Sequence, residues 1–180
     1  MQEWLNWHAW KVCRLFAGSP GFESPSFRHF MTIHILTIGK HHESWTKEGI
    51  EVFLKRLRPP FSADFVIMPH SSKPKGVAVK EESDRLLGRL SPDDFVILLD
   101  ERGRNLSSPE LSTVIMEHTS QNIVFIIGGA YGVTDDVRRR ANLVWSLSKL
   151  VFPHQLVRLI LTEQLYRAQE IARGGKYHHE

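Results

Sequence analysis

Residues 95–108 read FVILLDERGRNLSS, and this stretch decides the fold class. Its first five residues form an uninterrupted apolar run that ends at Asp100, which is typical of a strand buried on both faces. A second run of this kind, IVFII at 123–127, ends at Gly128-Gly129. Strands of this type are typical of parallel sheets, because helices cover both faces of such a sheet and bury both sides of each strand. The two runs therefore predict an α/β domain with a mostly parallel sheet flanked by helices.

From Met31 onward the chain alternates between strand and helix patterns, as this fold class requires. We expect strands at 33–38, 64–68, 95–99, 123–127 and 144–147. We expect helices at 43–57, 77–90, 108–118, 134–141 and 153–172. The last helix is apolar around most of its circumference, so more than the sheet must cover it. A second copy of the protein in a two-fold dimer would do so, and the alternative is another helix of the same chain.

The first thirty residues differ from the alternating part. They carry three Trp in the first ten positions and a Pro/Ser/Gly stretch at 19–27. We interpret 1–30 as an N-terminal extension outside a domain of residues 31–180, with a peripheral helix docking through its tryptophans as the alternative. The single cysteine, Cys13, excludes a disulfide within the chain and fits a reducing compartment. No apolar run approaches the ~20 residues that span a bilayer, so we expect a cytoplasmic protein without a membrane partner.

Polar or glycine-rich loops follow three of the expected strands. They read DERGRNLSS after 95–99, GGAYGVTDD after 123–127 and SKLVFPHQ after 144–147. If these strands are neighbours, the loops meet at the carboxyl edge of the sheet, where open parallel sheets bind ligands. Ordinary strand-to-helix turns also favour Gly, Asp and Ser, so that alternative stays open. Three such loops in one short domain favour a small-molecule pocket.

Several common chemistries lack their motifs. GGAYG does not have the G-x-G-x-x-G spacing of a dinucleotide site, and the chain has no phosphate-binding P-loop motif. The histidine pairs at 41–42 and 178–179 are adjacent in sequence, and no Cys or Glu cluster completes a metal-binding set, so we expect no metal. Nucleophilic catalysis is also disfavoured, because Cys13 lies in the extension and Ser146 and Ser148 lack a G-x-S-x-G turn.

Four segments, taken in order, carry a family resemblance. They are DERGRNLSS, FIIGGAYGV, the long block SLSKLVFPHQLVRLILTEQLYRAQEI at 146–171, and the terminal KYHHE. Together they resemble the SPOUT-class methyltransferases that methylate N3 of a pseudouridine in bacterial large-subunit (23S) ribosomal RNA. The opening MTIHILTIGK at 31–40 also resembles the start of that family, so the likeness runs from Met31 to Glu180. The IIGG is generic, whereas the SLSK…FPHQLVR block and the terminal Tyr-His are specific.

The resemblance implies a SPOUT-type α/β fold with a C-terminal trefoil knot, a homodimer, and S-adenosylmethionine as cofactor. It also implies that the partner is 23S ribosomal RNA within the large subunit or the assembled ribosome. By matching position, the cofactor contacts would be Leu99, Gly128, Leu147, Ser148, Lys149, Leu150, Val151 and Phe152.

Methylation at N3 requires loss of the N3 proton, and the resemblance points to residues that could assist. Tyr177 and His178 on the tail, from either subunit, would position the base and assist proton loss. Arg158 would hold a phosphate or stabilise the imide anion. His154 either joins this chemistry or caps the helix and packs the loop. In the tail His179 stands where the family commonly has Arg or Lys, so a permanent charge becomes titratable.

The charge distribution bears on the RNA partner. Residues 137–180 carry eight basic and three acidic side chains, a bias that would let this segment face phosphate. A domain of this size has no separate RNA-binding module, so we expect activity on assembled particles and little on naked RNA. Two alternatives remain: a SPOUT enzyme acting on another RNA such as tRNA, and a non-catalytic ribosome-binding relative.

Overall fold

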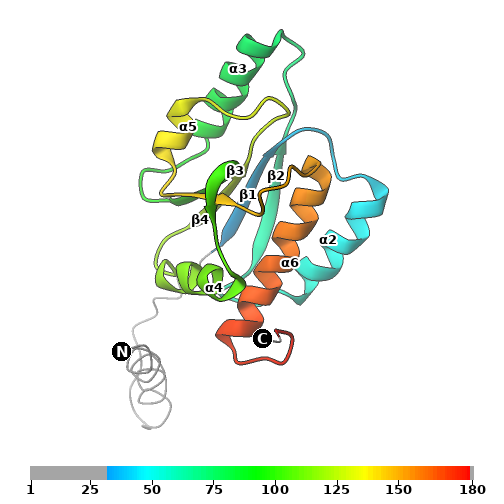
Figure 1. Cartoon of the computed structure of the whole chain (residues 1–180), viewed down its shortest axis with the longest axis vertical. Coiled ribbons are helices and arrows are strands. Elements are labelled where there is room, and N and C mark those ends of the chain that lie inside the picture. The colour runs from blue at the N-terminus through cyan, green and yellow to red at the C-terminus, as the bar shows by residue number, and fades with distance from the viewer. Residues whose placement is uncertain (1–31, 179–180) are drawn as a thin grey trace.

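The computed structural model describes residues 32–178, so the interpretation of 1–30 as an extension lies outside the described residues. Strands and helices alternate along this part of the chain, as expected (Figure 1). The strands are β1 Ile33–Ile38, β2 Ala63–Met68, β3 Phe95–Asn105, β4 Ile123–Ile127 and β5 Leu143–Ser146. The helices are α2 Ser44–Arg56, α3 Lys75–Leu87, α4 Ser108–Glu117, α5 Asp135–Arg140 and α6 His154–Ala172.

All five strands form one parallel sheet in the order β2-β1-β4-β3-β5. This arrangement confirms the predicted fold class. It places β3 between β4 and β5, so the three strands that precede the polar loops are neighbours. Their carboxyl ends therefore lie at one edge of the sheet, as parallel pairing requires.

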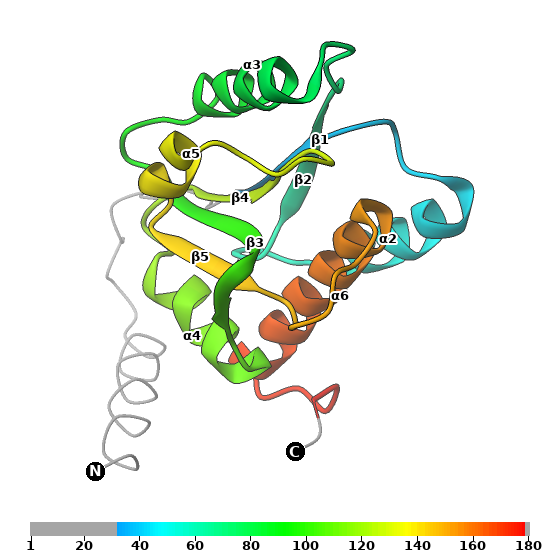
Figure 2. The ribbon, with the colours of Figure 1, turned by 45° about the horizontal axis from the view of Figure 1, so that its top comes forward.

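Helices cover both faces of the sheet (Figure 2). Alternate residues of each strand point to opposite faces, so β4 divides its apolar run between two cores. Ile123, Phe125 and Ile127 pack with α2, α4 and α6, whereas Val124 and Ile126 pack with α3 and α5. The continuous apolar sequence is thus explained by burial on both sides.

Helix α6 lies between α2 and α4 on one face of the sheet. Its inner stripe, which includes Leu161, Leu165 and Ala168, is fully buried in the core. Flanking helices of the same chain therefore cover part of the apolar circumference that suggested a dimer. Leu156 and Ile160 lie outside both apolar cores and are half-buried. Among residues 32–178, no helix is long and apolar enough to cross a bilayer.

Strand β3 is six residues longer than its apolar run predicted. Its pairing with β5 shifts register after Leu99, and the strand then pairs again through Arg104 and Asn105. Gly103 makes this second pairing possible, because a Cβ at this position would lie 2.7 Å from backbone atoms of Val144 and Trp145. The polar sequence DERGRN concealed the extension, since its side chains have no apolar alternation.

Candidate active site

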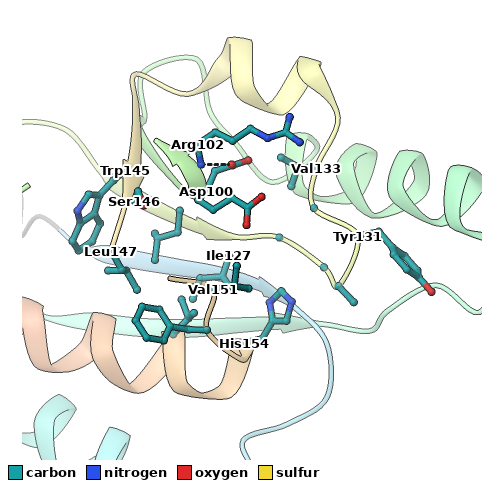
Figure 3. Close-up of a pocket in the computed structure, with 18 of the residues that line it drawn as sticks. Asp100, Arg102, Ile127, Tyr131, Val133, Trp145, Ser146, Leu147, Val151 and His154 are labelled. Carbon is teal, nitrogen blue, oxygen red and sulfur yellow. Dashed lines mark hydrogen bonds between the residues drawn. The ribbon is translucent and has the colours of Figure 1, made fainter. Parts of the chain in front are cut away.

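A cavity of about 400 Å³ opens at the carboxyl edge of β3, β4 and β5 (Figure 3). Residues from all three predicted loops line it, and the first residues of α6 close one side. The convergence that the sequence predicted is therefore present. Its apolar wall comes from strand ends, the loop before α6 and the first turn of α6, and includes Leu99, Ile127, Trp145, Leu147, Phe152 and Val157.

The glycine-rich loop after β4 brings backbone to the cavity wall. Gly132 donates its N–H to the carbonyl of Gly129 at 2.9 Å, and its φ of +79° favours glycine at this turn. A Cβ at Gly128 would lie 2.8 Å from Cγ1 of Val133. The loop therefore needs glycine for its own packing, and it presents peptide groups to the cavity where side chains would collide.

Residues 147–152 form an irregular loop held by two serine hydroxyls. Ser146 Oγ donates to the carbonyl of Ser148 at 2.7 Å, and Ser148 Oγ accepts from the N–H of Leu150 at 3.0 Å. This turn leaves Leu150 and Val151 largely exposed at the cavity mouth. Of the predicted cofactor contacts, the structure brings these seven to the cavity: Leu99, Gly128, Leu147, Ser148, Leu150, Val151 and Phe152. Lys149, the eighth, is exposed and does not line the cavity.

One arginine braces two of the three loops. Arg138 Nη2 lies 2.9 Å from Asp100 Oδ2, at the end of the apolar part of β3, and Nη1 donates to the carbonyl of Val133 at 3.0 Å. Burial alone would lower the pKa of Arg138, but Asp100 and Asp135 outweigh it and raise that pKa. The sequence pattern did not predict this role for Arg138, because Asp100 is far away in sequence.

His154 lines the cavity at the start of α6, as its place beside the loop predicted. Pro153 occupies the cap position and α6 has no side-chain cap, so the capping alternative has no support among the contacts of His154. Burial, followed by the charge of Arg158, lowers the pKa of His154, with Glu82 opposing them. The imidazole is therefore neutral at neutral pH.

Arg158 has a structural position that differs from the predicted one. Its side chain is 1% exposed and does not line the cavity. Its guanidinium donates to Thr37 Oγ1 at 3.2 Å and to the carbonyls of Ile38 and Lys40 at 3.3 and 2.8 Å. Burial lowers the pKa of Arg158. This geometry argues against a phosphate or imide contact and gives Arg158 the role of securing the end of β1.

The predicted tail residues lie at the other end of α6. Tyr177 donates its hydroxyl to Glu163 Oε1 at 3.2 Å, and its ring centroid lies 4.8 Å from that of Tyr166. Burial and the charge of Glu163 raise the pKa of Tyr177, so its hydroxyl stays protonated. Nδ1 of His178 is buried without a hydrogen-bond partner among residues 32–178. The structure therefore does not bring the tail and the cavity of one chain together.

Comparisons with known proteins agree with this architecture. The family model described as "Predicted SPOUT methyltransferase" matches residues 31–178. The chain belongs to the SPOUT methyltransferase family. This SPOUT methyltransferase is 40% identical over 158 residues to "Ribosomal RNA large subunit methyltransferase H" of Carboxydothermus hydrogenoformans, covering 82% of this chain and 99% of that protein. It is 41% identical over 155 residues to the protein of the same name from Cytophaga hutchinsonii, covering 83% and 100%.

A solved structure supports the fold of this SPOUT methyltransferase. The crystal structure of a probable methyltransferase from Bordetella pertussis Tohama I aligns with a TM-score of 0.50 at 12% identity, covering 77% of this chain and 95% of that one. The trefoil knot that the resemblance implies stays a prediction. Among the described residues, no group of three or more His, Cys, Asp or Glu could hold a metal ion.

Proposed function

We propose that this SPOUT methyltransferase transfers a methyl group from S-adenosylmethionine to N3 of a pseudouridine in 23S ribosomal RNA, on assembled ribosomal particles in the cytoplasm. The observation that carries the proposal is the cavity at β3, β4 and β5, lined by seven of the eight residues predicted for the cofactor. Relatives named as large-subunit ribosomal RNA methyltransferases, at about 40% identity over nearly their whole length, supply the substrate class.

The residues that line the cavity fit S-adenosylmethionine. Its volume of about 400 Å³ falls in the range of small-molecule sites. Leu99, Leu147 and Phe152 offer an apolar surface for a flat base, and the backbone of Gly128 and Gly129 offers donors and acceptors without side chains. When bound, the cofactor supplies an electrophilic methyl carbon. The protein's contribution is to orient the two reactants and to exclude water.

The geometry bears on which subunit supplies the tail. His154 lines the cavity, whereas Tyr177 packs on Tyr166, twelve residues further along α6. At 1.5 Å per residue this separation is about 18 Å along the helix axis. A two-fold axis crossing α6 would bring the tail of one protomer toward the cavity of its partner. We therefore propose a homodimer in which each site combines one cavity with the partner's tail, with the half-buried outer face of α6 in the interface.

Within this site, the side chains divide the work of removing the N3 proton. Neutral His154 at the cavity wall accepts the hydrogen bond from N3–H and then takes the proton itself, becoming an imidazolium. Tyr177 of the tail is a donor, because its raised pKa keeps the hydroxyl protonated. His178, with its buried unpaired Nδ1, completes the contact to the base. These three groups would orient the base so that N3 faces the methyl carbon.

The proposal is tested by methylation of particles from a strain that lacks this gene. Purified protein with S-adenosylmethionine is offered intact ribosomes, large subunits, protein-free 23S transcript or tRNA, and the RNA is mapped by mass. We expect one methyl group on a single pseudouridine of 23S RNA, and far slower transfer to the transcript.

Calorimetric titration with S-adenosylmethionine is the control for these reactions. Weak or absent cofactor binding, together with no methylation of any substrate, would point to a non-catalytic relative. Methylation of tRNA alone would show that the substrate is a different RNA. Equal rates on protein-free transcript would contradict the requirement for assembled particles.

A further inference from the structure

Tyr131 occupies the tip of the glycine-rich turn that borders the cavity. Tyr131 is 57% exposed although it borders the cavity, and aromatic side chains in such positions are common at interfaces. Figure 3 shows the ring at the rim, directed away from Asp100 and out of the cavity. The flat face of the Tyr131 ring is therefore exposed at the rim, next to the place where a substrate would enter the cavity.

One backbone hydrogen bond and one cation restrict the position of the Tyr131 ring. The Gly132 N–H bond to the Gly129 carbonyl closes the turn beneath it. Nζ of Lys75, the first residue of α3, lies 5.4 Å from the ring centroid, within the range of a cation–π contact. A side chain ordered before binding loses little entropy on contact with a ligand. The ring is thus suited to stacking.

Cations at the rim have no acidic partner to neutralise them. Lys75 and Arg102 line the cavity, and Lys149 lies in the loop beside it. Among residues 32–178, none of these three forms an ion pair with a carboxylate within 4.0 Å. Asp100 is already paired with Arg138, which leaves Glu101 as the opposing charge at the rim. The rim is therefore positive on balance.

An exposed ring beside unpaired cations matches the chemistry of an unpaired nucleotide. Bases splayed from single-stranded RNA stack on aromatic side chains, while Lys and Arg contact the phosphates. We infer that Tyr131 is a stacking platform for a nucleotide that flanks the methylated base, with Lys75 contacting its phosphate. This inference rests on the proposed function, and it adds a substrate-positioning residue outside the cofactor contacts.

The test compares full-length Tyr131→Ala, Tyr131→Phe and Lys75→Ala with the wild-type protein. Ribosomes lacking the methyl group are used to measure the binding constant by co-sedimentation and kcat/KM by methyl transfer. S-adenosylmethionine affinity is measured by calorimetry. Met116→Ala is the matched control, because Met116 is an exposed apolar side chain on α4 and does not line the cavity.

Loss of one base stack corresponds to about a 5- to 150-fold weaker interaction, so Tyr131→Ala is expected to lose ribosome affinity and kcat/KM by that factor. Tyr131→Phe retains most of both, since the ring remains. Lys75→Ala reduces the slope of log affinity against log salt by about one. Cofactor affinity stays within about twofold in Tyr131→Ala and Tyr131→Phe, because the ring lies at the rim and is directed out of the cavity (Figure 3).

Other outcomes would overturn the inference in distinguishable ways. A parallel loss of S-adenosylmethionine affinity in Tyr131→Ala would make the ring a cofactor contact. Wild-type affinity and kcat/KM in that variant would remove any role in binding RNA. If the wild-type protein binds ribosomes without methylating them, the proposed function fails. The ratio of the ribosome-binding constants of the wild type and Tyr131→Ala still shows whether the ring stacks on RNA. If the wild-type protein does not bind ribosomes, both fail.

Discussion

At the scale of single residues, His154 connects the cavity to the pH dependence of stability. Its pKa in the folded protein lies below 6.5, mainly because of burial, so the unfolded chain binds the proton more readily. The stability linked to His154 is therefore complete above pH 6.5 and declines as the pH falls toward the lower folded value. The pKa of His42 is also lowered, and burial is again the main cause.

We expect the wild-type protein to lose unfolding free energy when the pH is lowered from about 7.5 to about 5.5, and His154→Gln to lose less. Urea denaturation at both pH values measures the unfolding free energy of each protein. His70→Gln, at an exposed position, is the control and should leave that loss unchanged. An equal loss in wild type and His154→Gln would show that the proton binds elsewhere.

The sequence pattern predicted which loops line the cavity, because a buried strand must end at the sheet edge and its loop must turn there. The individual cofactor contacts were predicted from the family resemblance, and neither source predicted the role of every polar group. Arg158 could not be assigned in this way. Two of its three partners are the backbone carbonyls of Ile38 and Lys40, about 120 residues earlier, and backbone acceptors have no sequence signature.

At the scale of elements, the pairing of β3 with β5 depends on one missing side chain. Gly103→Ala would place a methyl group 2.7 Å from backbone atoms of Val144 and Trp145. The backbone of a paired strand cannot move aside as a flexible side chain can, so we expect a loss of about 3 kcal/mol in unfolding free energy. We also expect weaker S-adenosylmethionine binding, since β5 leads into the 147–152 loop.

Denaturation and calorimetry on the same samples measure both effects. Gly76→Ala is the matched substitution, because a Cβ there meets nothing within 4 Å and lies inside α3. That variant should be as stable as wild type, or more stable by up to about 1 kcal/mol. A Gly103→Ala protein as stable as Gly76→Ala would show that the strands separate without cost.

The bounds of the elements follow from the sequence wherever burial alone determines them. β1 and β4 agree with their predicted ranges, because their apolar runs begin and end with the sheet. β3 does not, because its last residues are held by pairing to β5 and not by burial. The local sequence pattern indicates which residues are buried. It does not indicate an irregular strand pairing, because that pairing depends on a partner strand elsewhere in the chain.

At the scale of the whole molecule, the separation of cavity and tail makes a prediction about mixed dimers. Gly128→Val removes the cavity and keeps the tail, and His178→Ala does the reverse. If each site takes its tail from the partner, a heterodimer of the two has one complete site, and we expect about half the wild-type methylation rate per dimer. Co-expression with two affinity tags isolates it.

Each homodimer of the two variants is the control, and both are expected to be inactive while giving wild-type far-ultraviolet circular dichroism. A heterodimer as inactive as its parents would show that the tail serves its own chain. A monomeric wild-type protein by sedimentation at micromolar concentration would contradict the dimer itself.

The central position of α6 also has a consequence for synthesis. The helix that fills the groove between α2 and α4, and the edge strand that completes the sheet, both come from the last forty residues of the chain. A nascent chain that still lacks them has an open core on one face and no third loop for the cavity. Folding of this domain therefore cannot finish until residues 143–172 have left the ribosome, the very particle whose RNA we propose the protein modifies.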